Sequence, residues 1–169
     1  MKNLLTILAL LSAVLAIPNA GAQTPIKKAE RDELSFVPSD DPAMERAFGK
    51  ARATLDNFLQ MASAPAQGTS DYAVKVAVSD GKRTEYFWVS EFERSGDKFS
   101  GRLANEPRIV KKYKNGQRFE FPRNLIVDWT YIDASKKKMF GNFTACALLT
   151  REPPEEARKF RGRFGLDCD

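Results

Sequence analysis

The chain has 169 residues, of which 43% are hydrophobic, and its 27 basic and 22 acidic residues give a formal net charge of +5. It contains no histidine, which excludes Ser-His-Asp and Cys-His catalytic arrangements and leaves a zinc site only carboxylates and two cysteines as ligands. No glycine-rich nucleotide or phosphate-loop motif occurs either. We therefore expect neither a metal ion nor a cofactor.

The first 22 residues contain the three parts of a secretory signal peptide. Lys2 supplies a positive charge, residues 4–17 form a largely apolar run, and small residues at 20–22 precede Gln23. An uncleaved membrane anchor is the alternative, but a spanning helix needs roughly 20 apolar residues, and this run has 14. We therefore predict cleavage between Ala22 and Gln23, and a periplasmic or secreted mature chain without a transmembrane segment.

The segment after the predicted cleavage site, residues 23–39, is polar and lacks hydrophobic periodicity, which predicts a flexible leader. Residues 40–169 are expected to form a single domain. Its first helix begins at the Asp40-Asp41-Pro42 sequence, because Asp caps free backbone N–H groups and Pro is favoured in the first turn. Apolar residues at spacings of three and four predict that this helix reaches about Met61.

From residue 71 the hydrophobic period changes to two, which is typical of β-strands. Residues 72–78 and 84–92 are expected to pair as a hairpin around the Asp80-Gly81 turn. Further expected elements are strands at residues 99–103, 108–113, 117–121, 125–132 and 139–150. A short helix is expected to start at residues 153–156, to run through about Arg161 and to end near Gly162 or Gly165.

This order of elements predicts an α+β fold. The N-terminal helix would pack on a curled, mostly antiparallel sheet of five to seven strands, with a short helix at the C-terminus.

The two cysteines, Cys146 and Cys168, could pair in an oxidising compartment. A buried free thiol and an intermolecular bridge are the alternatives. The pair lacks Cys-x-x-Cys spacing, which leaves a redox function without its motif. We expect a structural disulfide that ties the C-terminal tail to the predicted strand at 139–150 and stabilises the fold by roughly 3 kcal/mol.

Asp128 is the candidate acid-base residue, because the predicted strand at 125–132 places its carboxylate among apolar groups, and such surroundings raise a carboxyl pKa. The alternative, which we favour, is a structural role. An inward-facing Asp usually accepts hydrogen bonds from loop backbone or pairs with an arginine, here Arg108 or Arg123. We therefore assign no catalytic residue.

The second half of the chain is basic, with 15 basic and 9 acidic residues from Gly101 onward. Lys112 and Lys114 would share one face of the predicted strand at 108–113 and its continuation, and with Lys136-Lys137-Lys138 could bind anions. Solvated lysines on a strand edge are the alternative. Export makes nucleic acid an improbable partner, so an envelope protein, a toxin or an anionic envelope component is expected instead.

Four segments in succession carry a family resemblance. They are an aromatic strand at 86–89, a Gly-x-Leu-x-Asn-x-Pro turn at 101–107, an Asp-Trp pair at 128–129 and a Gly-x-Phe-Thr segment at 141–144. In this order they resemble the YegJ-like family of uncharacterised bacterial proteins, a DUF2314-type domain of unknown function. The resemblance covers about residues 41–150 and implies a fold unit without an activity.

The resemblance directs attention to Asn105 in the turn and to Asp128 and Trp129 in the strand. We expect Asp128 to fix the Asn105 loop through backbone hydrogen bonds. The same three residues could instead line a ligand groove, so they are candidate binding residues together with Lys112 and Lys114.

Three functions follow from these observations. We favour a non-enzymatic periplasmic binding or interaction domain. The alternative is a periplasmic immunity protein that neutralises a bacterial toxin, since the chain also loosely resembles small immunity domains. A carboxylate-dependent enzyme is the third.

Overall fold

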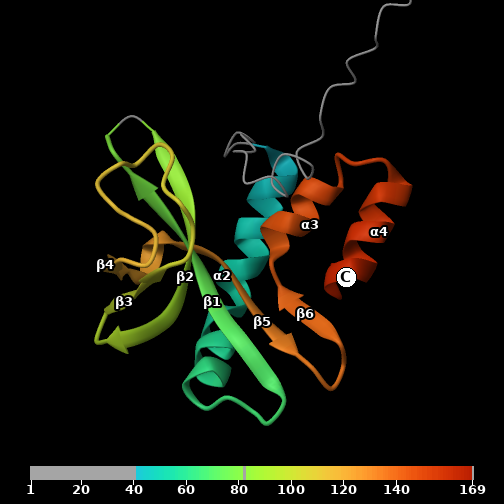
Figure 1. Cartoon of the computed structure of the whole chain (residues 1–169), viewed down its shortest axis with the longest axis horizontal. Helices are drawn as coiled ribbons and strands as arrows, with labels where there is room; N and C mark the ends of the chain where they lie inside the picture. Colours follow the sequence, from blue (N-terminus) through green and yellow to red (C-terminus); the bar gives the residue numbers. More distant parts are fainter. Residues whose placement is uncertain (1–40, 82, 169) are drawn as a thin grey trace, which may run out of the picture.

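A long helix followed by an antiparallel sheet forms the body of the molecule in the computed structural model, which describes residues 41–81 and 83–168 (Figure 1). The predicted signal peptide, its cleavage site and the leader at 23–39 lie outside the described residues. The elements in chain order are α2 (Pro42–Ser63), β1 (Thr69–Ser79), β2 (Thr84–Ser95), β3 (Lys98–Leu103), β4 (Arg118–Pro122), the 3-10 helix η1 (Arg123–Leu125), β5 (Ile126–Asp133), β6 (Lys138–Gly141), α3 (Phe143–Leu149) and α4 (Pro154–Phe164).

The six strands form one open sheet in the order β4-β3-β2-β1-β5-β6, and every neighbouring pair is antiparallel. Short turns join most consecutive strands, which favours antiparallel pairing. The α+β prediction, with a helix before the sheet and a short helix at the C-terminus, is confirmed.

Helix α2 starts where the sequence predicts. The Asp41 side chain accepts hydrogen bonds from the backbone N–H groups of Ala43 and Met44, each at 3.0 Å, and so caps the first turn. Asp41 also forms an ion pair with Arg151, which follows α3. The helix start is therefore fastened to a segment far away in the sequence.

The hairpin of β1 and β2 sorts its side chains between two faces. Val74 pairs with Val89 and Val76 with Phe87, and these four side chains are fully buried in the main core. Side chains alternate along a strand, so the intervening pair, Lys75 and Trp88, lies on the opposite face. That opposite face carries the polar cluster described below.

The predicted strand at 108–113 is wrong, because this segment belongs to a loop, residues 104–117, between β3 and β4. A buried carboxylate, Glu85, accepts the backbone N–H groups of residues 108–110. Those N–H groups are therefore not available to a neighbouring strand. Ile109 and Val110 are both buried although they are consecutive, which a regular strand with one solvent-facing side does not allow.

The predicted strand at 139–150 is also wrong beyond its first residues. The strand β6 ends at Gly141, Asn142 adopts a left-handed conformation with φ 51°, and the chain then turns into α3. Consequently Cys146 lies on a helix and not on a strand. Ala145, Ala147 and Leu148 are good helix formers, which agrees with this geometry.

The C-terminal helix α4 ends at Phe164, and Gly165, one of the two glycines near which the sequence predicts its end, follows it in a left-handed conformation with φ 61°. The chain beyond it runs along the outer edge of β6. The Met139 N–H donates to the Gly165 carbonyl at 2.8 Å, and the Asp167 N–H donates to the Met139 carbonyl at 3.1 Å. Across residues 41–81 and 83–168, no helix has both the length and the apolar character needed to cross a membrane.

Candidate functional site

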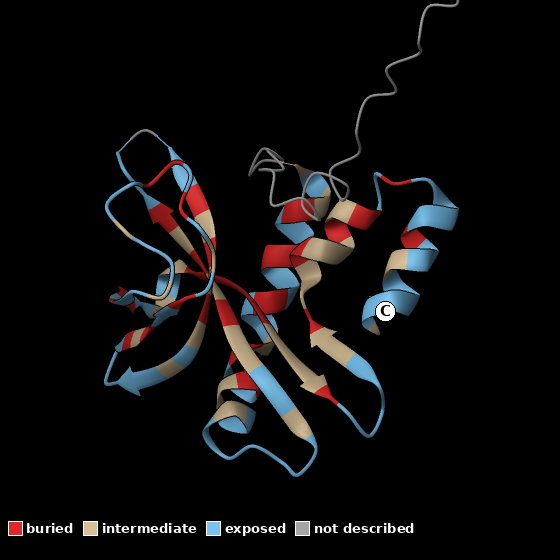
Figure 2. Cartoon of the chain, in the orientation of Figure 1, coloured by how far each residue is buried: buried red, intermediate tan, exposed pale blue. Residues whose placement is uncertain are grey.

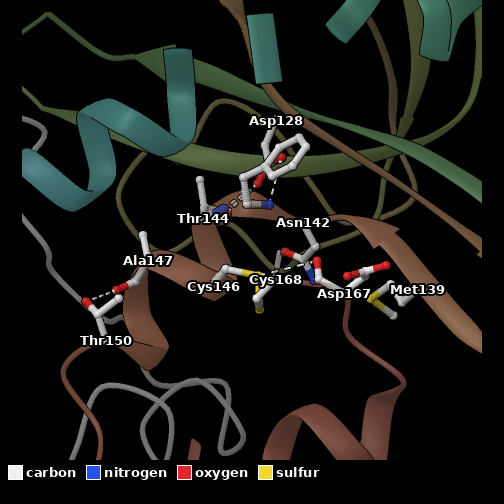
Figure 3. The surroundings of a disulfide bond; sticks show 10 residues. Asp128, Met139, Asn142, Thr144, Cys146, Ala147, Thr150, Asp167 and Cys168 are labelled. Atoms are coloured by element: carbon white, nitrogen blue, oxygen red, sulfur yellow. Dashed lines mark hydrogen bonds between the residues drawn. A yellow bond between two sulfur atoms is a disulfide. The ribbon is translucent and has the colours of Figure 1, made fainter. Parts of the chain in front are cut away.

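A polar cluster lies between β1, β5 and α3, on the face of the sheet opposite the main core. Asp128 of β5 is fully buried and accepts four hydrogen bonds. One oxygen accepts hydrogen bonds from the backbone N–H groups of Trp129 at 2.8 Å and Phe143 at 3.2 Å. The other oxygen accepts hydrogen bonds from the backbone N–H of Thr144 at 2.8 Å and from the Thr144 hydroxyl at 2.6 Å. Asp128 therefore fixes the start of α3 (Figure 3).

Lys75 completes the cluster from β1, where it is the cross-strand partner of Asp128. Its ammonium donates to the Thr144 hydroxyl at 2.6 Å and lies 4.5 Å from the centre of the Trp88 ring, within the range of a cation–π interaction. Thr144 thus accepts from Lys75 and donates to Asp128. The hydroxyl connects the two charges.

Burial shifts the pKa of both charged groups. Burial raises the pKa of Asp128, and the nearby charge of Lys75 and the hydrogen bonds from Thr144 and Trp129 oppose this rise. Burial likewise lowers the pKa of Lys75, with Asp128 acting in the opposite direction. The two opposite charges compensate each other inside the fold, and their contacts join β1, β5 and α3.

The expected contact between Asp128 and the Asn105 loop is wrong. The Asn105 side chain instead accepts the backbone N–H of Trp88 at 2.6 Å. Neither Arg108 nor Arg123 is among the hydrogen-bond donors to Asp128, which are Trp129, Phe143 and Thr144. Arg123 instead forms an ion pair with Asp56 at 2.9 Å. Asp128 has the structural type of role that the sequence favoured, but it acts on α3.

Trp129 is a core residue. Its ring stacks on Phe58 at 4.8 Å, and its indole N–H donates to the Ala51 carbonyl at 3.2 Å and to the Thr54 hydroxyl at 3.1 Å, all in α2. The backbone of Gly141 passes directly against it, and a Cβ atom at that position would overlap the Trp129 carbonyl oxygen. Trp129 therefore fastens the helix to the sheet.

The loop at 104–117 is held by two side chains from β2 and from the loop itself. Glu85 is 5% exposed and accepts the N–H groups of Arg108 at 2.8 Å, Ile109 at 2.9 Å and Val110 at 2.9 Å. Three consecutive N–H groups around one carboxylate form an anion-binding nest. Together with the Asn105 contact to Trp88, this nest fixes the path of the loop over β2.

The loop presents several basic side chains to solvent. Lys111, Lys112 and Lys114 are all exposed, and the Lys111 ammonium donates to the Pro107 carbonyl at 3.2 Å. The Lys112 ammonium lies 5.0 Å from the Tyr113 ring centre. Because this segment is a loop, the expectation that Lys112 and Lys114 share a strand face is wrong, but both remain on one exposed segment.

The cysteines are placed as a disulfide that joins α3 to the C-terminal tail (Figure 3). The Cα atoms of Cys146 and Cys168 are 5.5 Å apart, a usual spacing for such a bond. Lys138 and Asp167 form an ion pair at 3.0 Å beside it. The disulfide thus holds the tail against both α3 and the edge of β6.

The candidate residues form two separate groups. Asp128 and Trp129 belong to the interior, whereas Asn105, Lys112 and Lys114 belong to the loop at 104–117. The sequence did not single out Lys75, Glu85 or Thr144 for these roles. Lys75 lies at an ordinary polar position of the β1–β2 hairpin. Glu85 shares the buried face of its strand with Phe87 and Val89, so the alternation could have marked it as an inward-facing carboxylate, but not which distant segment it binds.

The described residues contain no group of three or more His, Cys, Asp or Glu side chains that could hold a metal ion.

Comparison with known proteins places the chain among bacterial proteins without an assigned activity. A family model described as DUF2314, uncharacterized protein conserved in bacteria, matches residues 41–168. The uncharacterized protein YegJ of Escherichia coli is 33% identical over 125 residues, which cover 74% of this chain and 79% of that protein. No solved structure matches. The matched region includes the Asp128 cluster, the loop and both cysteines, and the chain belongs to the DUF2314 family of YegJ-like proteins.

Proposed function

We propose that the protein is an exported, non-enzymatic binding domain of the bacterial periplasm, and that the loop at 104–117 contacts an acidic protein partner. The signal-peptide pattern of residues 1–22 supports export. The cysteine pair, placed for a disulfide, is compatible with an oxidising compartment.

The observation that carries this proposal is that two loop lysines have no ion-pair partner among the described residues. Across residues 41–81 and 83–168, neither Lys112 nor Lys114 forms an ion pair. Many other exposed cations have acidic partners, as in Arg83 with Asp80, Lys98 with Glu120 and Arg102 with Glu91. Unpaired lysines concentrated on one loop create a local positive potential, which attracts an acidic surface and accelerates association with it.

The fixed path of the loop strengthens the argument. Loops of this length without secondary structure are uncommon in compact domains and often have a function. The contacts of Glu85 and Asn105 hold this loop in one conformation, so less conformational entropy is lost when a partner binds. Preorganised lysines are typical of a recognition surface.

The chemistry of the loop favours a protein over a bilayer. Its apolar side chains at Pro107, Ile109 and Val110 are buried, and the half-buried Tyr113 ring packs on Phe119 with the centres 4.8 Å apart. The loop therefore presents no large, fully exposed apolar side chain to lipid. Lys112 and Lys114 are therefore suited to the carboxylates of a protein surface. A partner that proved to be a toxin would make this an immunity protein, the alternative function.

The interior carboxylate supports binding rather than catalysis. Both oxygens of Asp128 are occupied by hydrogen bonds from the fold itself, and its neighbour Lys75 is engaged by Thr144 and Trp88. A general acid or base needs its reactive atom within reach of a substrate. Asp128 is instead used to position α3.

The test is recovery of a partner from envelope extract with the tagged full-length protein, followed by mass spectrometry. Lys112→Gln/Lys114→Gln should lose the partner recovered by the wild type. Arg83→Gln/Lys98→Gln is the matched control, because it removes two exposed charges that already have acidic neighbours, and it should retain the partner. Equal recovery by both double variants would contradict the assignment to the loop.

Export is tested separately by cell fractionation and by mass spectrometry of the N-terminus. The proposal expects a periplasmic product that begins at Gln23. A cytoplasmic product that keeps residues 1–22 would overturn the export part of the proposal and leave the loop test unaffected.

A further inference from the structure

The apolar stripe of α4 extends beyond the body of the protein. Ala157, Phe160 and Phe164 follow at spacings of three and four, which places them along one side of the helix. Ala157 is buried, Phe160 is half-buried and Phe164 is 41% exposed. Most of α4 is exposed in Figure 2. The last turn of the helix therefore offers an aromatic side chain to an external surface.

Phe164 is held in this position rather than left to move freely. Its ring packs on Phe160 with the centres 4.6 Å apart, and the Arg163 guanidinium lies 5.2 Å from its centre. Within the described part of the chain, Met61 and Phe164 are the exposed large hydrophobic residues. An exposed, fixed aromatic residue is suited to inserting into a membrane interface.

Two cations without ion-pair partners among the described residues lie in the segments next to this aromatic residue. Arg161 is three residues before Phe164 on α4, while Lys137 lies in the turn between β5 and β6. Both are exposed and neither forms an ion pair among the described residues, whereas Arg158 and Lys159 pair with Glu155 and Glu156 on the same helix. The positive charge is therefore concentrated at the end of α4.

The turn and the helix end are adjacent. A Cβ atom on Gly165, the residue after Phe164, would overlap the Lys137 carbonyl oxygen. The hydrogen bond from the Met139 N–H to the Gly165 carbonyl and the ion pair of Lys138 with Asp167 hold the two segments together. The Cys146–Cys168 disulfide fastens the tail that follows. Phe164, Arg161 and Lys137 thus belong to one braced surface, which we call the α4 tip.

We propose that the α4 tip docks on bilayers that contain anionic phospholipids. Phe164 enters the boundary between headgroups and acyl chains, while Arg161 and Lys137 contact lipid phosphates. The combination of an exposed aromatic residue with unpaired cations is the chemistry of peripheral membrane binding. The loop at 104–117 lies on the other side of the molecule in Figure 1, so docking leaves it accessible. This surface is independent of the proposed partner site.

The experiment is sedimentation with vesicles of phosphatidylcholine containing about one third phosphatidylglycerol, using the chain recovered from cells expressing the full sequence. All variants must have the same N-terminus by mass spectrometry, so that residues 1–40 contribute equally. We expect Phe164→Ser to weaken partitioning about tenfold, and Arg161→Gln and Lys137→Gln to weaken it about fivefold each. Pure phosphatidylcholine vesicles should bind the wild type much less.

Matched controls separate docking through the α4 tip from non-specific binding to vesicles. Met61→Ser removes the other exposed large hydrophobic residue of the described chain and should change partitioning less than twofold. Lys112→Gln/Lys114→Gln removes two positive charges, as Arg161→Gln/Lys137→Gln does, and should also change partitioning less than twofold. Thermal denaturation confirms that each variant folds. The proposal would be overturned if Lys112→Gln/Lys114→Gln weakened vesicle binding as much as Arg161→Gln/Lys137→Gln does. Unchanged partitioning of Phe164→Ser, or no binding of the wild type to anionic vesicles, would overturn it as well.

Discussion

Asp128 of β5 accepts both the backbone N–H and the hydroxyl of Thr144, 16 residues further along the chain, through one carboxylate oxygen. The other oxygen takes the N–H groups of Trp129 and Phe143. One side chain thus determines where α3 starts and, through Thr144, contacts the Lys75 ammonium. This relationship explains why a fully buried carboxylate is retained in the fold.

Replacement of Asp128 by Ala should lower the free energy of unfolding by about 3–5 kcal/mol, because buried N–H donors and the Lys75 charge lose their partner. Urea denaturation measures this change. Asp56→Ala is the control: its side chain is 80% exposed and pairs with Arg123, so its loss should cost less than about 1 kcal/mol. Similar costs for the two variants would contradict the anchoring role of Asp128.

Asp133 should titrate at low pH. The Ser135 hydroxyl, at 2.6 Å, is the largest cause that lowers the pKa of Asp133 to about 2, and the Lys136 N–H and ammonium act in the same direction. A depressed folded-state pKa stabilises the fold above the ordinary pKa of 3.8, and this contribution is lost as pH falls from there through about 2.

Asp133→Asn removes the titrating group, so its stability should vary less than that of the wild type between pH 4 and pH 2. Carbon-detected NMR titration of the wild type checks the pKa directly. A value near 3.8 for Asp133 would show that the Ser135 and Lys136 contacts do not hold in solution.

Substitution by alanine should change the stability of the protein in opposite directions at Gly141 and Gly49. Gly141 has φ 75° and leaves no space for a Cβ atom beside Trp129, so Gly141→Ala should destabilise the protein by at least about 2 kcal/mol. Gly49 lies within α2 with nothing within 4 Å of a Cβ position, and Gly49→Ala should stabilise by up to about 1 kcal/mol. Thermal denaturation of the two variants gives the sign of each change in stability. A Gly141→Ala variant as stable as the wild type would argue against the close approach of Gly141 to Trp129.

The disulfide should be detected as a peptide pair joining Cys146 to Cys168 in non-reduced material from the periplasm. Cys146→Ser/Cys168→Ser should lower the free energy of unfolding by about 3 kcal/mol. Reductant should bring the wild type to the stability of the double variant and leave the double variant unchanged. Recovery of two free thiols would refute the disulfide.

Local patterns in the sequence predicted the elements that depend on neighbouring residues. The Asp41 cap and the β1–β2 hairpin follow from residues within a few positions of each other, and both are confirmed. The prediction of a strand at 108–113 is wrong because the backbone N–H groups of residues 108–110 donate hydrogen bonds to Glu85, more than 20 residues away. Hydrophobic periodicity carries no information about such a distant acceptor.

The same limit applies to the candidate site. An inward-facing Asp128 could be anticipated from its apolar neighbours. Its partner Thr144 was predicted to lie in a strand, so the hydrogen bonds from the start of α3 to Asp128 could not be predicted. The basic segment with Lys112 and Lys114 was recognised by composition. Its conformation was not predicted, because the alternation of β2 places Glu85 on the buried face but does not identify residues 108–110 as the donors that it binds.

The most direct test of the proposed function uses Glu85→Gln, which keeps every lysine of the loop and replaces one of the two oxygens that hold residues 108–110. Hydrogen exchange at these amides should become faster, while thermal denaturation shows that the domain still folds. Recovery of the acidic partner from envelope extract should then fall well below that of the wild type, because the lysines are no longer preorganised. Faster exchange at residues 108–110 with undiminished recovery of the partner would contradict the account.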